Sequence, residues 1–377
     1  MNAIILAAGH GTRMVASKQF IHKPLLPIHG IPNIERTIIM LKDYGIHDIV
    51  IISGMYAEHY SYLHEKYNCL IVSDSSASLS TLYGVYSIKD KIGDTFIIEG
   101  DVVLAENIFT YRPYSFYYVI KYPNCESDAW KPITDSNGRI ISFKIGCFKE
   151  PCIFGVSFWS IHDAKCIKNF INHISTPENL CNSNKFWDDY LEDVIDDFPI
   201  FTVEISPDSA TEMNDANEHN FAQKLCYSYY LNPNKYFLNL RNYDIDISFF
   251  VNSEQAIYYT KELLSDYNLK HSNNIQDINI PITFSSNEYT YIIKKGDNII
   301  GFIDLVLETT YLLLRRIYID RNYRNQSLGT IVVNKLISFS KLINKELRVN
   351  VYDSYAARFY ERLGFKQNFI NYILRSE

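Results

Sequence analysis

Two segments of this sequence carry residues whose types and spacing could bind phosphate and a divalent cation. Leu6-Ala7-Ala8-Gly9-His10-Gly11-Thr12-Arg13 follows an apolar run, and the glycines at 9 and 11 allow backbone N–H groups to close on a phosphate. Arg13 and Lys23 add positive charge to this segment. Asp101 follows a second apolar run, where its carboxylate could hold a cation. Together they indicate a site for a phosphate and a metal ion.

These residues need strands that end close together. Residues 3–6, 48–52, 70–72 and 95–98 have the apolar composition of buried strands, and they alternate with two helical patterns. One helix is predicted over 33–44, ending at Gly45, and another follows Ser80, which can cap it. Ligands of open α/β sheets bind at the carboxyl ends of the strands, so the glycine segment and Asp101 should share one crevice.

Length and composition narrow the class of protein. The 377 residues correspond to about two domains, and the net charge of −7 gives no basic field for nucleic acid. Seven cysteines without a CxxC pair favour reduced thiols in a cytoplasmic protein over a zinc site. No apolar stretch reaches the roughly 18 residues of a membrane span, so no membrane insertion is expected.

The C-terminal third has its own pattern. Hairpin-like strands are predicted over 289–294 and 299–307, and a further strand over 312–319 leads into a loop and a long helix. The loop, Arg321-Asn322-Tyr323-Arg324-Asn325-Gln326-Ser327-Leu328-Gly329-Thr330, is a second anion site at a helix start. A strand over 347–351 and a helix over 354–363, closed by Gly364, complete this part. We expect domains at 1–225 and 240–377, joined by a linker at 226–239.

The first domain resembles a known family. The glycine segment, with a lysine ten residues after Arg13, is similar to nucleotidyltransferases that activate sugar phosphates, molybdopterin and choline phosphate. Residues 154–159 (FGVSFW) and 186–189 (FWDD) are most similar to the bacterial choline-phosphate cytidylyltransferases. One departure is His22-Lys23-Pro24, where Pro-Lys is usual.

This resemblance implies a Rossmann-like mixed sheet, CTP as co-substrate and one Mg²⁺. The metal would be held by Asp101 and by one residue of the segment Thr211-Glu212-Met213-Asn214-Asp215. Asn214 is the expected ligand of this segment, and Asp215 is the second candidate. Arg13, Lys23 and the main-chain donors would align the phosphates, and no general base is required. The acceptor's ammonium would meet an aromatic and acidic pocket; the alternative is that its tryptophans belong to the core. The pocket residues are Trp130, Trp159, Trp187 and Asp188.

The tail resembles the GNAT acyltransferases, through the loop and through Ala356-Ala357-Arg358-Phe359-Tyr360-Glu361-Arg362-Leu363-Gly364-Phe365. The resemblance implies that acetyl-CoA or another acyl-CoA binds at Arg324, Ser327, Gly329 and Thr330, with Ser327 in place of a glycine. It also implies that Tyr360 protonates the leaving thiolate, and Glu308 is a candidate base.

The sequence therefore predicts a two-domain α/β enzyme with two transferase activities. It would transfer a cytidylyl group from CTP to a small amine-bearing phosphate or phosphonate, and the tail would acylate an amine. The alternative is a sugar-1-phosphate nucleotidylyltransferase with an inactive CoA-binding or dimerising tail. Both need only small-molecule substrates, and a homodimer is left open.

Overall fold

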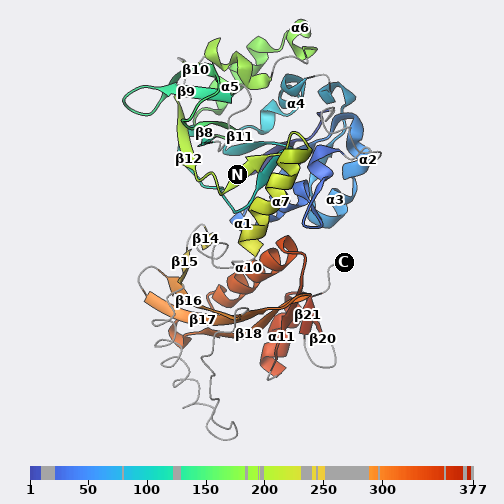
Figure 1. The fold of residues 1–377 in the computed structure, drawn as a ribbon, viewed down its shortest axis with the longest axis vertical. Coiled ribbons are helices and arrows are strands. Elements are labelled where there is room, and N and C mark those ends of the chain that lie inside the picture. Colours follow the sequence, from blue (N-terminus) through green and yellow to red (C-terminus); the bar gives the residue numbers. More distant parts are fainter. Residues whose placement is uncertain are drawn as a thin grey trace, which may run out of the picture. The chain divides into compact units, whose positions relative to one another are not determined.

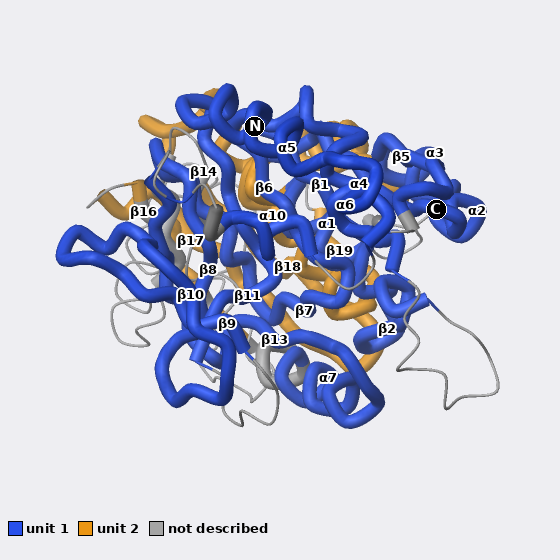
Figure 2. Tube along the Cα trace, turned by 90° about the horizontal axis from the view of Figure 1, so that it is seen from above, with its two compact units in different colours: residues 1–42, 46–227 blue, residues 43–45, 228–377 orange. Residues whose placement is uncertain are grey.

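The computed structural model describes residues 1–9, 22–78, 80–121, 129–182, 186–193, 195, 199–230, 240–242, 245–250, 288–295, 298–351, 354–367 and 372–374. The chain divides into two compact units (Figure 2). Unit 1 comprises residues 1–42 and 46–227, and unit 2 comprises 43–45 and 228–377. No helix in these described stretches is both long enough and apolar enough to cross a membrane.

A seven-stranded mixed sheet forms the centre of unit 1 (Figure 1). Its strand order is β12-β8-β11-β6-β1-β4-β5. β11 runs antiparallel to both of its neighbours, and the other pairs are parallel. The strands are β1 (Asn2–Leu6), β4 (Asp48–Ile52), β5 (Leu70–Val72), β6 (Thr95–Glu99), β8 (Ser115–Ile120), β11 (Cys152–Trp159) and β12 (Ile200–Ile205). The expected Rossmann-like mixed sheet is confirmed.

Several helices of unit 1, α1, α4 and α5 among them, bury apolar side chains. Ser80 caps α4 by accepting a hydrogen bond from the N–H of Tyr83 at 3.1 Å, as the sequence predicts. α4 and α5 pack with central strand residues such as Ile4 and Val50 into one core cluster. The helices are α1 (Asn33–Tyr44), α2 (Ala57–Tyr60), α3 (Tyr62–Tyr67), α4 (Thr81–Ser87), α5 (Ala164–Ile174), α6 (Pro177–Leu180) and α7 (Ala216–Tyr230).

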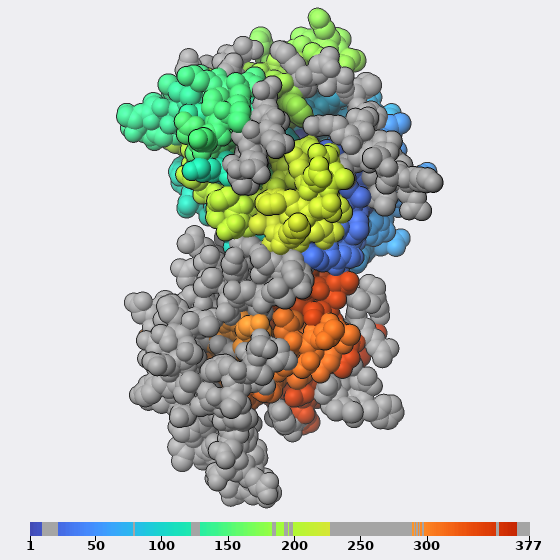
Figure 3. All heavy atoms as spheres, viewed as in Figure 1, coloured from blue at the N-terminus to red at the C-terminus, as the bar shows by residue number. Residues whose placement is uncertain are grey.

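Three short strand pairs lie beside the main sheet. β7 (Val102–Leu104) pairs antiparallel with β13 (Ala210–Glu212), and this pairing joins the chain after β6 to the segment before α7. β9 (Ala129–Thr134) and β10 (Ile140–Gly146) form a ribbon at the edge of unit 1, whereas α7 lies on its surface (Figure 3). β2 (Pro27–Ile28) and β3 (Ile31–Pro32) form the third pair.

Unit 2 contains an eight-stranded sheet of order β14-β15-β16-β17-β18-β19-β21-β20. All of its pairs are antiparallel except β18 with β19. The expected α/β tail is confirmed. Its elements are β14 (Leu240–Asn242), β15 (Ile245–Phe250), β16 (Glu288–Lys295), β17 (Asn298–Leu307), β18 (Tyr311–Ile319), α10 (Leu328–Leu342), β19 (Glu346–Val349), α11 (Ser354–Arg362), β20 (Lys366–Gln367) and β21 (Tyr372–Leu374).

Candidate active site

The carboxyl ends of β1 and β6 define the candidate site of unit 1. The two strands are parallel neighbours with Leu6 opposite Glu99, and the N–H of Gly100 donates to the Leu6 carbonyl at 2.9 Å. A Cβ on Gly100 would lie 2.7 Å from that oxygen and 2.8 Å from Cγ of Pro24. Glycine at position 100 therefore allows Asp101 to stand directly beside the start of the glycine segment.

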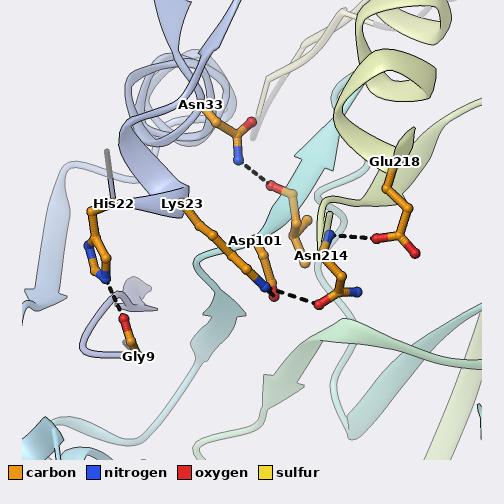
Figure 4. A network of polar contacts seen from close by, with 8 residues as sticks. Gly9, His22, Lys23, Asn33, Asp101, Asn214 and Glu218 are labelled. Atoms are coloured by element: carbon orange, nitrogen blue, oxygen red, sulfur yellow. Dashed lines mark hydrogen bonds and ion pairs between the residues drawn. The ribbon is translucent and has the colours of Figure 1, made fainter. Parts of the chain in front are cut away.

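Lys23 connects Asp101, which follows β6, with Asn214, which precedes α7 (Figure 4). It belongs to a short 3₁₀ helix, η2 (Lys23–Leu25), and its side chain is only 9% exposed. Its Nζ donates to Oδ2 of Asp101 at 3.3 Å and to Oδ1 of Asn214 at 3.1 Å. Pairing of β7 with β13 explains this meeting, because it leaves the N–H of Met213 bonded to the Asp101 carbonyl at 3.0 Å.

The start of α7 holds Asn214 in place. The Glu218 carboxylate accepts a hydrogen bond from the N–H of Asn214 at 2.5 Å, and Oδ1 of Asp215 accepts from the N–H groups of residues 217 and 218 at 2.8 and 2.9 Å. Asp215 therefore caps the helix, whereas Asn214 directs its side chain to the site. This arrangement favours Asn214 as the ligand that the sequence suggests.

The structure brings together part of the predicted nucleotide site. Leu6, Ala8 and Gly9 lie at the end of β1, in the same region as Lys23 and Asp101. Gly11, Thr12 and Arg13 lie outside the described residues. Sequence reasoning missed His22, whose imidazole contacts both the Gly9 carbonyl and the hydroxyl of Tyr60. A single histidine before a lysine carries no motif that would have revealed this.

Several carboxylates lie around Glu99, the last residue of β6. Desolvation, together with the charges of Asp101, Asp188 and Glu212, raises the pKa of Glu99 well above its usual value, and Lys23 opposes this shift. Desolvation raises the pKa of Asp188 to about 6, although hydrogen bonds from its own backbone and from Tyr117 oppose the shift. The Tyr117 hydroxyl donates to Oδ2 of Asp188 at 3.2 Å. A positive charge placed beside these carboxylates would favour their ionised forms.

The tryptophans differ in their surroundings. Trp159 and Trp187 are 0% and 2% exposed, and their rings contact each other edge to face at 5.2 Å within the core cluster. The backbone N–H of Trp187 donates to Oγ1 of Thr81 at 2.9 Å, which fixes Asp188 next to it. Trp130 lies on β9, half-buried against Phe143. Trp159 and Trp187 are thus core residues, and a ring face for an ammonium remains a prediction.

The donors at the site suit a hard cation. An oxygen of Asp101 and an oxygen of Asn214 both converge on the Lys23 ammonium, so they already face one positive charge, and carboxylate and amide oxygens are what Mg²⁺ prefers. Among the described residues, no group of three or more histidines, cysteines, aspartates or glutamates is arranged to hold a metal. Two protein oxygens are nevertheless sufficient for Mg²⁺, which usually keeps waters and binds substrate phosphates.

The loop before α10 forms the second candidate site, in unit 2. Ser327 precedes the helix with φ +59°, and Asn325 has φ +61°, so a serine occupies a left-handed position that glycine prefers. Nε of Arg324 donates to the Ile319 carbonyl at 2.8 Å. Gly329 and Thr330 lie in the first turn of α10, where free N–H groups can meet an anion.

The helix α11, which carries Tyr360, contacts the start of α10. A Cβ on Gly329 would stand 3.6 Å from Cζ of Phe359, the residue before Tyr360, so the first turn of α10 contacts α11 at this point. Tyr360 is 5% exposed between the rings of Phe359 and Phe365, and burial raises the pKa of its phenol. The Tyr360 phenol is therefore protonated at neutral pH.

Comparison with known proteins agrees with this geometry. Residues 3–109 match the MobA-like NTP transferase domain. A choline-phosphate cytidylyltransferase of Haemophilus influenzae is 36% identical over 227 residues, which are 60% of this chain and 97% of that protein. The chain belongs to the MobA-like nucleotidyltransferase family. Residues 286–367 match the acetyltransferase (GNAT) domain, so the chain combines two transferase domains in one enzyme.

Two further relatives of the nucleotidyltransferase domain are informative. A 2-aminoethylphosphonate cytidylyltransferase of Lancefieldella rimae is 29% identical over 224 residues, covering 58% of this chain and 89% of that protein. The solved CTP:phosphocholine cytidylyltransferase of Streptococcus pneumoniae is 26% identical with a TM-score of 0.56, covering 59% of this chain and 98% of that one. These two relatives thus match this chain over most of their own length, and neither match extends over unit 2.

Proposed function

We propose that unit 1 transfers a cytidylyl group from CTP to a small amine-bearing phosphate or phosphonate. The observation that carries the proposal is the meeting of Lys23, Asp101 and Asn214 at the ends of β1 and β6, within a cluster of carboxylates. The lysine and the oxygen donors suit a nucleoside triphosphate with Mg²⁺, and the carboxylates suit a positively charged acceptor. Relatives named for choline phosphate and 2-aminoethylphosphonate support this substrate class.

The reaction needs alignment and charge neutralisation rather than a base. An anionic oxygen of the acceptor attacks the α-phosphorus, a new P–O bond forms, and the bond to the bridging oxygen breaks to release pyrophosphate. Lys23 would hold the phosphates against this developing charge, with Arg13 as a second cation from the glycine segment. Asp101 and Asn214 would hold Mg²⁺, which supplies Lewis-acid stabilisation of the phosphoryl oxygens when bound.

Asp188 would orient the acceptor. Its carboxylate would attract the ammonium group, while the Tyr117 hydroxyl fixes its orientation. A sugar phosphate lacks the cation and would gain nothing from Asp188, so this residue distinguishes the two acceptor classes.

One experiment separates the candidate reactions. Four nucleoside triphosphates are incubated with choline phosphate, 2-aminoethylphosphonate or glucose 1-phosphate, with Mg²⁺, and pyrophosphate release is measured. We expect release with CTP and an amine-bearing acceptor. Release only with the sugar phosphate would overturn the proposed acceptor, and no release from any combination would overturn the proposed transfer.

For unit 2 we propose N-acylation of an amine by an acyl-CoA. The amine nitrogen attacks the thioester carbonyl, the C–S bond breaks, and the leaving thiolate takes a proton from Tyr360. The position of Tyr360 on α11, which contacts the first turn of α10 through Phe359, supports this role. Calorimetry with acetyl-CoA tests binding, and Tyr360→Phe should slow acyl transfer while leaving the affinity for CoA unchanged.

The cytoplasm fits both reactions. Among the described cysteines, Cys69, Cys166, Cys181 and Cys226 carry free thiols, as expected in a reducing compartment. CTP and acyl-CoA are both donors made inside cells. We therefore propose that the enzyme works in the cytoplasm.

A further inference from the structure

His22 lies between the glycine segment and two other elements of unit 1. It is 3% exposed, and its Nε2 contacts the carbonyl oxygen of Gly9 (Figure 4). Its Nδ1 contacts the hydroxyl of Tyr60 on α2. The imidazole also stacks on the ring of Tyr56, with 4.2 Å between centroids, and Tyr56 ends the short helix η3 (Gly54–Tyr56). The ring is therefore held at both nitrogens and on one face.

The partners determine the tautomer of this imidazole. A carbonyl oxygen can only accept, so the Nε2–H of His22 donates to Gly9. In the neutral ring Nδ1 is then an acceptor, and it receives the O–H of Tyr60. Tyr60 is 0% exposed, and burial raises its pKa. Its phenol therefore stays protonated and serves as the hydrogen-bond donor. The two hydrogen bonds thus form a directed chain from Tyr60 through His22 to Gly9.

This chain connects two parts of the nucleotide site. Gly9 is the first glycine of the glycine segment, and His22 directly precedes Lys23. The His22 carbonyl accepts from the N–H of Leu25 at 2.8 Å, which starts the helical turn carrying the lysine. A shift of His22 would therefore move the Gly9 carbonyl. It would also move the Lys23 ammonium, which is bonded to Asp101 and Asn214.

We propose that His22 is a positioning residue that ties Gly9 of the glycine segment to the turn bearing Lys23. The proposal rests on the proposed nucleotidyl transfer by unit 1. His22 acts through Gly9 and Lys23, and it needs no contact with the substrate. A displacement of about 1 Å in phosphate-aligning groups can reduce a reaction rate by about a hundredfold, so loss of this tie should be visible in catalysis.

The test separates the hydrogen bonds from the packing. His22→Phe keeps a ring against Tyr56 but removes both hydrogen bonds and leaves the Tyr60 hydroxyl buried without its acceptor. The double variant His22→Phe with Tyr60→Phe removes that hydroxyl as well, so stability should recover toward wild type. His22→Gln can still donate an amide N–H to the Gly9 carbonyl. His64→Phe is the control. The imidazole of His64 also contacts a carbonyl oxygen, that of Cys69 at 2.9 Å, but His64 lies on α3 and is not one of the residues of the candidate site.

We expect kcat/KM for CTP to fall by about a hundredfold in His22→Phe and to stay low in the double variant, even though its melting temperature recovers. His22→Gln should regain at least about tenfold of this loss, and His64→Phe should keep kcat/KM within about threefold of wild type. Binding of acetyl-CoA to unit 2 should be unchanged throughout. Activity that follows melting temperature across the series, or an unchanged kcat/KM in His22→Phe, would overturn the proposal.

Failure of the proposed function gives a different result. In that case wild type transfers no nucleotide, and calorimetric affinity for CTP becomes the readout. A tenfold weaker affinity in the double variant, with recovery in His22→Gln, would support the positioning role on its own. Equal affinities in wild type and the double variant would overturn it.

Discussion

Lowering the pH from 7 to 5 should weaken the binding of a permanent cation to unit 1 about tenfold, because Asp188 loses its charge in this range. Desolvation raises the pKa of Asp188 to about 6. A carboxyl group with that pKa is about nine-tenths ionised at pH 7 and about one-tenth ionised at pH 5. Only the ionised form attracts an ammonium, so the affinity should follow the ionised fraction.

Choline is the right probe, since it carries a fixed charge and no group that titrates between pH 5 and 7. Its inhibition constant against choline phosphate, or its calorimetric affinity, is measured at pH 5, 6 and 7. Asp188→Asn should bind choline more weakly and without this pH dependence. Asp74→Asn is the control, because Asp74 is exposed and hydrogen bonds from Ser76 lower its pKa, so its charge persists at pH 5.

Equal affinity of wild type for choline at pH 5 and 7 would refute this reasoning, as would an unchanged pH slope in Asp188→Asn. The same shift has a consequence for stability. Because the folded state raises this pKa from an ordinary 3.8, the fold prefers the protonated form, and stability should fall as the pH rises through about 4 to 6. The cost at pH 7 is at most about 3 kcal/mol, so Asp188→Asn should raise the melting temperature there.

The remaining predictions concern one residue each. Asp101→Asn keeps the shape but removes the charge of a proposed Mg²⁺ ligand, so pyrophosphate release should fall at least about a hundredfold while acetyl-CoA binding is unchanged; unaltered release would contradict the metal role. Trp187→Ala removes a buried core ring and should cost unit 1 about 3–5 kcal/mol in urea unfolding, whereas a loss of acceptor affinity at constant stability would show a binding role instead. Ser327→Gly relieves a left-handed φ of +59° but adds backbone entropy to the unfolded chain, so stability should change by less than about 1 kcal/mol, and calorimetric affinity for acetyl-CoA by less than about tenfold. Binding by Ser327→Gly but not by wild type would show that the serine blocks the site.

Local pattern was sufficient for the elements that carry the chemistry. The apolar run before the glycine segment became β1, and the predicted helix over 33–44 is α1 with the same bounds. In the tail, the predicted strand over 312–319 and the helix over 354–363 correspond to β18 and α11 within one or two residues. Such elements are readable because their apolar periodicity and their capping residues lie within a few positions of one another.

Tertiary structure alone decided which residues meet. Lys23 and Asn214 are 191 positions apart, and their contact depends on the pairing of β7 with β13, whose register has no local signature in the sequence. The same is true of His22, because its partners Gly9 and Tyr60 come from separate elements.

The residues of the predicted ammonium pocket differ in their surroundings, and residue type alone did not reveal this difference. Trp159 and Trp187 have the residue type of a cation-binding pocket, but the packing of α4 and α5 against the sheet encloses both rings in the core cluster. Asp188, adjacent in sequence to Trp187, instead accepts a hydrogen bond from the Tyr117 hydroxyl, and desolvation raises its pKa. The sequence by itself determined the residue types and the strands and helices that carry them. The fold determined their neighbours and their exposure to water, because both depend on contacts between segments far apart in the chain.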